Sequence, residues 1–194
     1  MIPLRDRNPS DRVPVVVYAL LAINIAAFLY ELSLGKQGLS DFLDRYAITP
    51  QYVSDALRGQ RNLVSALIVP MFTSMFLHGG WMHLIGNMLY LWVFGDNVED
   101  RTGHVGFIAF YLAAGVAAMT LQVGLMLALN EPGSEALMMP NIGASGAIAG
   151  VLGLYAVTWP KARVLTLVPI FYILTLTELP AVLLLGFWFL IQLA

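Results

Sequence analysis

The sequence predicts an all-α protein, a polytopic transmembrane helix bundle with five spans present. Hydrophobic residues make up 59% of the 194 residues, against roughly 45–50% in soluble domains. Charged residues make up 11%, against about 25% in such domains. A soluble globule of this length could not bury so much apolar surface, so the composition indicates an integral membrane protein.

Charge and cysteine content exclude several other classes. The chain has 10 Lys and Arg against 12 Asp and Glu, a net charge of −2, and so offers no basic surface for nucleic acid. It has no cysteine, which excludes thiol catalysis, cysteine metal sites and a disulfide-stapled secreted domain. We therefore expect one membrane domain over residues 1–194, in contact with the lipid bilayer, with no metal or organic cofactor implied. The sequence carries no sign of the oligomeric state.

Long apolar runs set the expected spans. The first, Val13–Leu32, matches a hydrocarbon core of roughly 30 Å and follows a polar N-terminal segment, so it is interpreted as a retained span. Asn24 inside it is expected to face a neighbouring helix. The other spans are expected over Met75–Phe94, over His104–Leu129, over Ile142–Thr158 and from Glu178 to Ala194.

The segments between the spans differ in character. Gly35–Leu63 has apolar residues at helical spacing between charges, which predicts a functional loop lying in the membrane interface. Asp96–Arg101 is expected to form a short charged turn, and Val164–Thr177, which is apolar and contains Pro169, is expected to be interfacial. The distribution of Lys and Arg in the short segments predicts a cytoplasmic N-terminus, and we expect a bacterial or archaeal plasma membrane.

Ser145 is the first candidate for chemistry. It lies between Gly143 and Gly146 at the start of the fourth expected span. A serine there could simply cap the helix. It could also be a nucleophile, because flanking glycines leave room for a substrate carbonyl and a helix N-terminus offers free N–H groups to an oxyanion.

His83 and Asn87 are the second candidate. Four residues apart, they share one face of the second span. They could be interhelical polar contacts, or they could donate hydrogen bonds to a developing oxyanion. His78 is expected at the membrane surface or fixing the preceding loop, and His104 is expected to be an ordinary interfacial residue.

A run of small residues follows the serine. Gly146, Ala149, Gly150 and Gly153 form a face that lets another helix approach closely. That partner helix is a natural place for a general base.

The sequence from Met75 to Asp100 resembles the second-helix signature of the rhomboid intramembrane serine proteases, and Gly143–Gly150 resembles the active-site helix of the same family. The likeness covers Val13 to Ala194. It implies that Ser145 is the nucleophile, that His83 and Asn87 stabilise the oxyanion, and that Gly143 is the first glycine of the family's G-x-S-G motif. Residues 35–63 would be the family's first loop, although the Trp-Arg pair of many members is missing from it.

The resemblance also implies a Ser–His dyad whose histidine lies on a sixth helix in an Ala-His-x-x-Gly setting. No such motif occurs in this sequence, so the chain is expected to be incomplete at its C-terminus and inactive alone. The implied activity is a serine endopeptidase that cleaves transmembrane protein substrates in or beside the membrane. A non-catalytic rhomboid-like pseudoprotease that binds membrane proteins stays open as an alternative, and a small transporter is less favoured because ionisable residues lie near span ends or on one helix.

Overall fold

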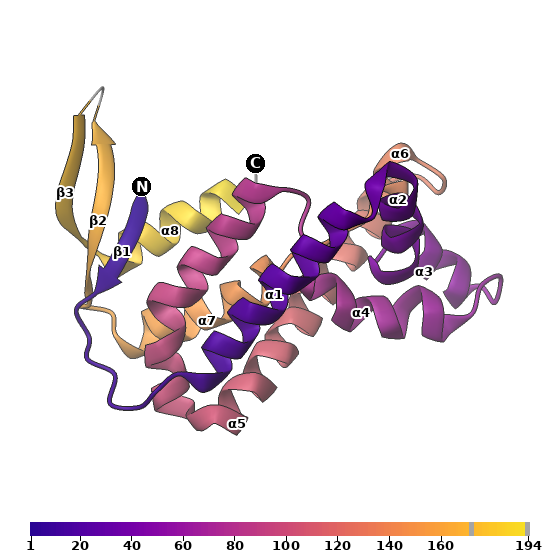
Figure 1. Cartoon of the computed structure of the whole chain (residues 1–194). Coiled ribbons are helices and arrows are strands. Elements are labelled where there is room, and N and C mark those ends of the chain that lie inside the picture. The colour runs from indigo at the N-terminus through magenta and orange to yellow at the C-terminus, as the bar shows by residue number, and fades with distance from the viewer. Residues whose placement is uncertain (171–172, 193–194) are drawn as a thin grey trace.

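The computed structural model describes residues 1–170 and 173–192. It is mostly helical, with a small three-stranded sheet at one side of the helices (Figure 1). The helices are α1 (Val15–Ser33), α2 (Gly35–Tyr46), α3 (Pro50–Leu57), α4 (Val69–Thr73), α5 (Trp81–Leu129), α6 (Glu135–Met138), α7 (Ser145–Thr158) and α8 (Ala181–Gln192), and a π turn (Val64–Ile68) and a 3₁₀ turn (Ser74–Phe76) flank α4. The strands are β1 (Ile2–Asp6), β2 (Arg163–Ile170) and β3 (Ile173–Pro180).

The long helix α5 consists of two antiparallel halves. Gly103, with φ 72° and ψ 162°, breaks its helical path, and the chain reverses there. A left-handed φ of this kind favours glycine because it has no Cβ. The charged run Asp96–Arg101 is helical, so the turn expected there was wrong. The chain turns slightly later, at Gly103. The second span also begins later than expected, at Trp81 rather than Met75, because Gly79 and Gly80 precede the helix.

Among the described residues, two helices are long and apolar enough to cross a membrane, α1 with 19 residues and α5 with 49 residues across its break. In the part of the chain that the structure describes, α7 and α8 are apolar but shorter, with 14 and 12 residues. Their positions agree with the fourth and fifth expected spans, but the count of five spans stays a prediction. The last residues of the fifth expected span, 193–194, lie outside the described residues.

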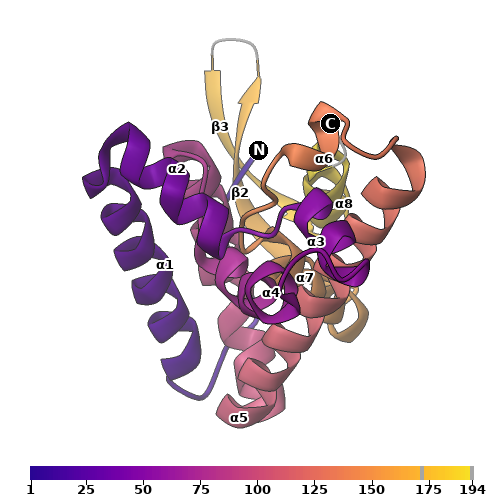
Figure 2. The same cartoon turned by 90° about the vertical axis from the view of Figure 1, so that its right-hand side faces the viewer.

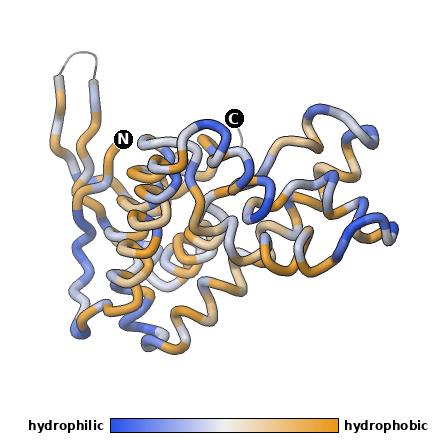
Figure 3. Tube along the Cα trace, turned by 45° about the vertical axis from the view of Figure 1, so that its right-hand side comes forward, coloured by the Kyte–Doolittle hydropathy of each residue, from blue (hydrophilic) through white to orange (hydrophobic). Residues whose placement is uncertain are grey.

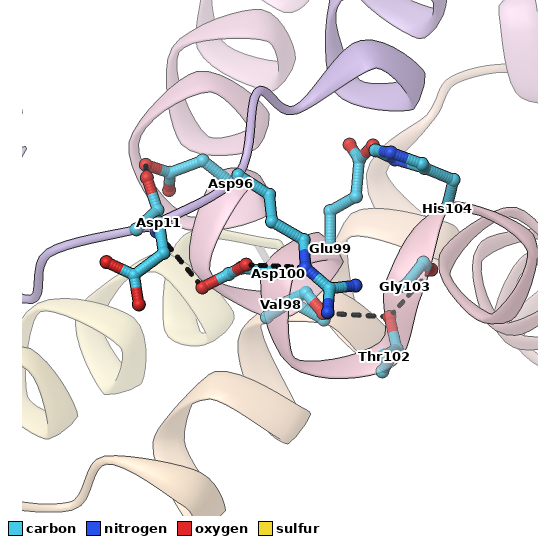
Figure 4. A network of polar contacts seen from close by, with 10 residues as sticks. Asp11, Asp96, Val98, Glu99, Asp100, Thr102, Gly103 and His104 are labelled. Atoms are coloured by element: carbon cyan, nitrogen blue, oxygen red, sulfur yellow. Dashed lines mark hydrogen bonds and ion pairs between the residues drawn. The ribbon is translucent and has the colours of Figure 1, made fainter.

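Polar contacts at the break in α5 fasten α1 to the bundle. The buried carboxylate of Glu99 accepts hydrogen bonds from the backbone N–H groups of Val16 (2.9 Å) and Val17 (2.8 Å), which are unpaired donors in the first turn of α1. His104 lies 2.5 Å from the same carboxylate (Figure 4). Nearby, Asp100 accepts the backbone N–H of Asp11. His104 is therefore part of this helix-anchoring contact.

The sheet corrects the all-α prediction. β2 pairs antiparallel with both β1 and β3, and Ile2, Leu167 and Leu176 lie side by side across it. The segment Val164–Thr177 was expected to be interfacial, with no strand assigned; its Leu and Thr residues alternate, which is the strand period. Phe171 and Tyr172 of that segment lie outside the described residues.

The first loop is helical, as its apolar spacing predicts. α2 has no buried residues, whereas α3 buries Pro50, Val53 and Ala56. Figure 1 shows α2, α3 and α4 together on the opposite side of the molecule from the sheet. Asn24 of α1 is fully buried, and its side chain donates to the carbonyl of Leu20 at 2.7 Å.

Tight packing between α7 and the second half of α5 forms the centre of the molecule. A Cβ added at Gly150 would lie 2.4 Å from the Cβ of Ala114, and one added at Gly146 would lie 2.7 Å from the Cβ of Ala118. Gly153 has no described neighbour within 4 Å of such a Cβ. The small-residue face thus lets the two backbones approach at Gly146 and Gly150, and Gly153 is not needed for that contact.

Candidate active site

Ser145 is the first residue of α7. The residue before it, Ala144, is the N-cap, and within the described residues no side-chain hydrogen bond caps this helix. The first helical bond runs from the N–H of Ile148 to the carbonyl of Ala144. The hydroxyl of Ser145 is therefore not used as a cap, and the N–H groups of the first turn have no partners within α7.

The segment before Ser145 is held by backbone hydrogen bonds from two directions. Asn141 donates its N–H to the carbonyl of Ile48 at 2.8 Å, and Gly143 donates its N–H to the carbonyl of Ser74 at 2.9 Å. Ile48 and Asn141 form an isolated β-bridge. The first loop and the turn before α5 therefore fix the position of the serine from outside α7.

His83 lies against Gly143. A Cβ added at Gly143 would stand 2.6 Å from Nε2 of His83 and 3.7 Å from Oγ of Ser145, so these two atoms are no farther apart than the sum of those distances. Gly143 has φ +125°, a left-handed value that a side chain disfavours. The glycine thus allows the imidazole to lie beside the hydroxyl.

Asn87 lies deeper than His83. It is buried, and its amide nitrogen donates to Nε2 of His78 at 3.1 Å. The rings of His78 and His83 meet edge to face, with centroids 5.0 Å apart. Ser145 and His83 therefore both lie close to Gly143, and Asn87 is linked to His83 through His78.

His78 is buried within the protein, with 2% of its surface exposed. Its backbone N–H lies 3.3 and 3.4 Å from the two carboxylate oxygens of Glu31 on α1, which agrees with the expectation that it fixes the loop. The expected span Met75–Phe94 would make His78 helical, but α5 begins only at Trp81. Gly79 and Gly80, which lie outside α5, were the signal that the chain bends after His78.

A cavity of about 490 Å³ opens beside the serine between α5, α7 and α8. Ser145 and His83 line it together with residues of the facing helices, among them Leu121, Leu125, Trp188 and Phe189. The helix that approaches Gly146 and Gly150 presents Ala118 and Ala114 to them. At these two contacts the partner helix carries small side chains and no general base, and the expected base on a helix packed against the small-residue face stays a prediction.

Comparison with known proteins identifies the family. The Rhomboid domain model matches residues 66–194. The chain belongs to the rhomboid family. Rhomboid protein 1, mitochondrial, from Saccharomyces cerevisiae is 33% identical over 156 residues, which cover 79% of this chain and 39% of the yeast protein.

Other rhomboid relatives match shorter stretches. Presenilin-associated rhomboid-like protein, mitochondrial, from Mus musculus is 33% identical over 106 residues, covering 54% of this chain and 26% of the mouse protein. Rhomboid-like protein 11, chloroplastic, from Arabidopsis thaliana is 33% identical over 96 residues, covering 48% of this chain and 31% of the plant protein. The chain thus spans well under half the length of these relatives.

Membership has two direct consequences. Rhomboids are integral membrane proteins, so the composition argument led to the correct environment. The family generally consists of serine proteases. A serine whose hydroxyl does not cap its helix, as Ser145 in α7, is consistent with that chemistry. The relatives named here are mitochondrial or chloroplastic, so they give no support to the expected bacterial or archaeal plasma membrane.

Proposed function

We propose that this rhomboid is an intramembrane serine endopeptidase that cleaves membrane proteins in or beside a transmembrane helix. The observation that carries the proposal is the position of Ser145. Its hydroxyl lies at the first turn of α7 beside His83, on a cavity, with Gly143 clearing the space between them. A serine that only capped the helix would use its hydroxyl on the backbone, and no such bond is found in the described residues.

In the proposed reaction, Oγ of Ser145 attacks the carbonyl carbon of the scissile peptide bond. The carbonyl oxygen becomes an oxyanion, which the backbone N–H of Ser145 and the side chains of His83 and Asn87 stabilise. Free N–H groups and the positive end of the α7 dipole favour negative charge at this place. Asn87 would reach the oxyanion with the amide hydrogen that His78 does not occupy.

The general base is proposed to be a histidine from outside residues 1–194, forming a Ser–His dyad with Ser145. The three histidines of this chain have other roles in the proposal or other contacts: His83 is proposed to stabilise the oxyanion, His78 bonds Asn87, and His104 pairs with Glu99 near the break in α5. The external histidine would take the proton of Ser145 and later give it to the leaving amine.

The substrate is proposed to be a transmembrane segment with small residues at the cut. The cavity beside Ser145 has apolar walls from α5 and α8, which suit a hydrophobic segment. A helical substrate hides its carbonyls in hydrogen bonds, and a glycine costs a helix about 1 kcal/mol relative to alanine, so such a segment unwinds more readily. We also propose a cytoplasmic N-terminus, supported by the Lys and Arg distribution.

The test uses the protein carried to the C-terminus of its gene, reconstituted in lipid vesicles with a fluorescent transmembrane substrate. We expect cleavage by the wild type and none above background by Ser145→Ala. Reaction with an active-site-directed fluorophosphonate should likewise require Ser145. Equal cleavage by both proteins would remove Ser145 as the nucleophile. Substrate binding without cleavage in the wild type would instead indicate a non-catalytic rhomboid-like pseudoprotease.

A further inference from the structure

The β2–β3 hairpin stands out beyond the helices in both views of the molecule (Figures 1 and 2). Successive residues of a strand point to opposite faces, and residues directly opposite in an antiparallel pair share a face. The register therefore sorts the sheet into two faces. One face carries Pro3, Val164 and Thr166, which are all buried, so this face packs on the protein.

The opposite face of the sheet is apolar and exposed. Ile2, Leu167 and Leu176 form one row across it, and Pro169 and Leu174 form the next row toward the tip. Leu174 is 66% exposed, Leu176 is 60% exposed and Ile2 is 44% exposed. We call these five residues the hairpin patch. Single exposed leucines are common, but rows of aligned apolar side chains on a projecting hairpin need a partner.

The charges of this face lie only at the base of the sheet. The row below the patch is Arg5, Leu165 and Glu178, and Arg163 follows on the same face. The sequence between Arg163 and Glu178 contains no charged residue. A surface that carries two arginines and a glutamate at one end and is apolar at the other matches the boundary of a phospholipid bilayer, where charged headgroups lie above acyl chains.

The hairpin patch continues an apolar surface of the helices. β3 ends at Pro180 and α8 begins at Ala181, and α8 exposes Leu183 and Leu190. The hydropathy view shows both hairpin strands and the helices beside them with mostly apolar colours (Figure 3). For an integral membrane protein, exposed apolar helix surface is the part that faces lipid.

The unpaired edge of the sheet limits how deep the hairpin can lie in the membrane. β3 is an edge strand, so its outward N–H and C=O groups have no strand partner in the described sheet. Such groups are not tolerated in the hydrocarbon core but can be hydrated in the interface. We propose that the hairpin patch lies in the headgroup and upper acyl region of the leaflet on the N-terminal side of α1, where it binds phospholipid as an interfacial anchor.

The absence of cysteine from this chain makes the test direct. Leu174→Cys and Leu176→Cys are each labelled with a nitroxide in the full chain, reconstituted in vesicles of phosphatidylcholine and phosphatidylglycerol. Relaxation by oxygen, which concentrates in lipid, is compared with relaxation by a water-soluble nickel chelate. Ile23→Cys on the exposed face of α1 is the lipid reference, and Lys161→Cys before β2 is the water reference.

We expect the labels at 174 and 176 to be relaxed more by oxygen than by the nickel chelate, but with a smaller excess than at Ile23 in the middle of α1, and the label at Lys161 mainly by the nickel chelate. Relaxation by nickel at 174 and 176, at the level of Lys161, would place the patch in water and overturn the proposal. Protection from both reagents would show that a protein surface covers the patch, and would also overturn it. The result does not depend on proteolysis, so it is independent of the proposed function.

Discussion

At the scale of single residues, the candidate site depends on a glycine, because a side chain at position 143 would collide with His83. Gly143 has a left-handed φ, and its α-carbon lies against the imidazole of His83. The G-x-S-G motif was recognisable in the sequence, but the contact that requires glycine at position 143 was not. From the sequence, this glycine is expected to leave room for a substrate carbonyl, and the structure shows that it also leaves room for His83.

Gly143→Ala tests this contact. The new Cβ would lie 2.6 Å from Nε2 of His83, so the ring must move and the backbone is strained. We expect cleavage by the full-length protein to fall about 10- to 100-fold, the effect of misplacing a catalytic group by about 1 Å. The initial rate of cleavage in vesicles measures it.

Gly79→Ala is the matched control for Gly143→Ala. It lies in the same region, and its nearest neighbour would be Cδ1 of Ile142 at an ordinary 3.9 Å. Its activity should stay close to that of the wild type. If Gly143→Ala cleaves as fast as Gly79→Ala, the contact with His83 is not needed for activity.

At the scale of elements, the sequence located the helices better than it located their ends. Hydropathy found α1, the second half of α5 and α7 to within about three residues, because apolar periodicity reports burial or lipid contact along a helix. The first half of α5 begins six residues later than expected and continues past Phe94 to the break at Gly103. Hydropathy did not locate the helix ends at Gly103 and after Gly79 and Gly80, because the backbone conformation of these glycines, and not apolar periodicity, ends the helix there. It also missed the strands, because a short apolar run does not distinguish a strand from an interfacial segment.

The close contact between α5 and α7 gives a prediction with an internal control. Gly150→Ala would place a Cβ 2.4 Å from that of Ala114, so the helices must separate, and we expect a loss of about 1–3 kcal/mol in the free energy of unfolding. Gly153→Ala, on the same helix, meets no described atom within 4 Å and should change stability by no more than about 1 kcal/mol. Unfolding in mixed detergent micelles measures both, and equal effects would contradict the packing argument.

At the scale of the whole molecule, a buried polar cluster joins the sheet to the helices. Asp6 of β1 accepts hydrogen bonds from Asn97 of α5 (3.0 Å) and from the hydroxyl of Tyr155 of α7 (2.7 Å). Burial raises the pKa of Asp6 to about 6 from an ordinary 3.8, against the effect of the Tyr155 hydrogen bond, which lowers it. The charged form of Asp6 is therefore costly in the folded state.

Stability should consequently decrease as pH rises through the pKa of Asp6. Between about pH 4 and pH 6 the folded state binds more protons at Asp6 than the unfolded state does, so the free energy of unfolding falls with rising pH. The contribution is on the order of 1–3 kcal/mol. Asp6→Asn should remove this slope from detergent unfolding curves, whereas Asp11→Asn, at an exposed position, should keep it. An unchanged slope in Asp6→Asn would contradict the assignment.

The sequence by itself determined the membrane environment, the helical character and the residues Ser145, His83 and Asn87 as candidates, because composition, apolar periodicity and short motifs are local properties. Only the tertiary structure decided which of these three residues lie close together. Ser145 and His83 lie more than sixty residues apart and are brought together by Gly143 and by backbone bonds from Ile48 and Ser74. The sheet, too, depends on pairing β1 with β2 across the whole chain, which no local pattern records.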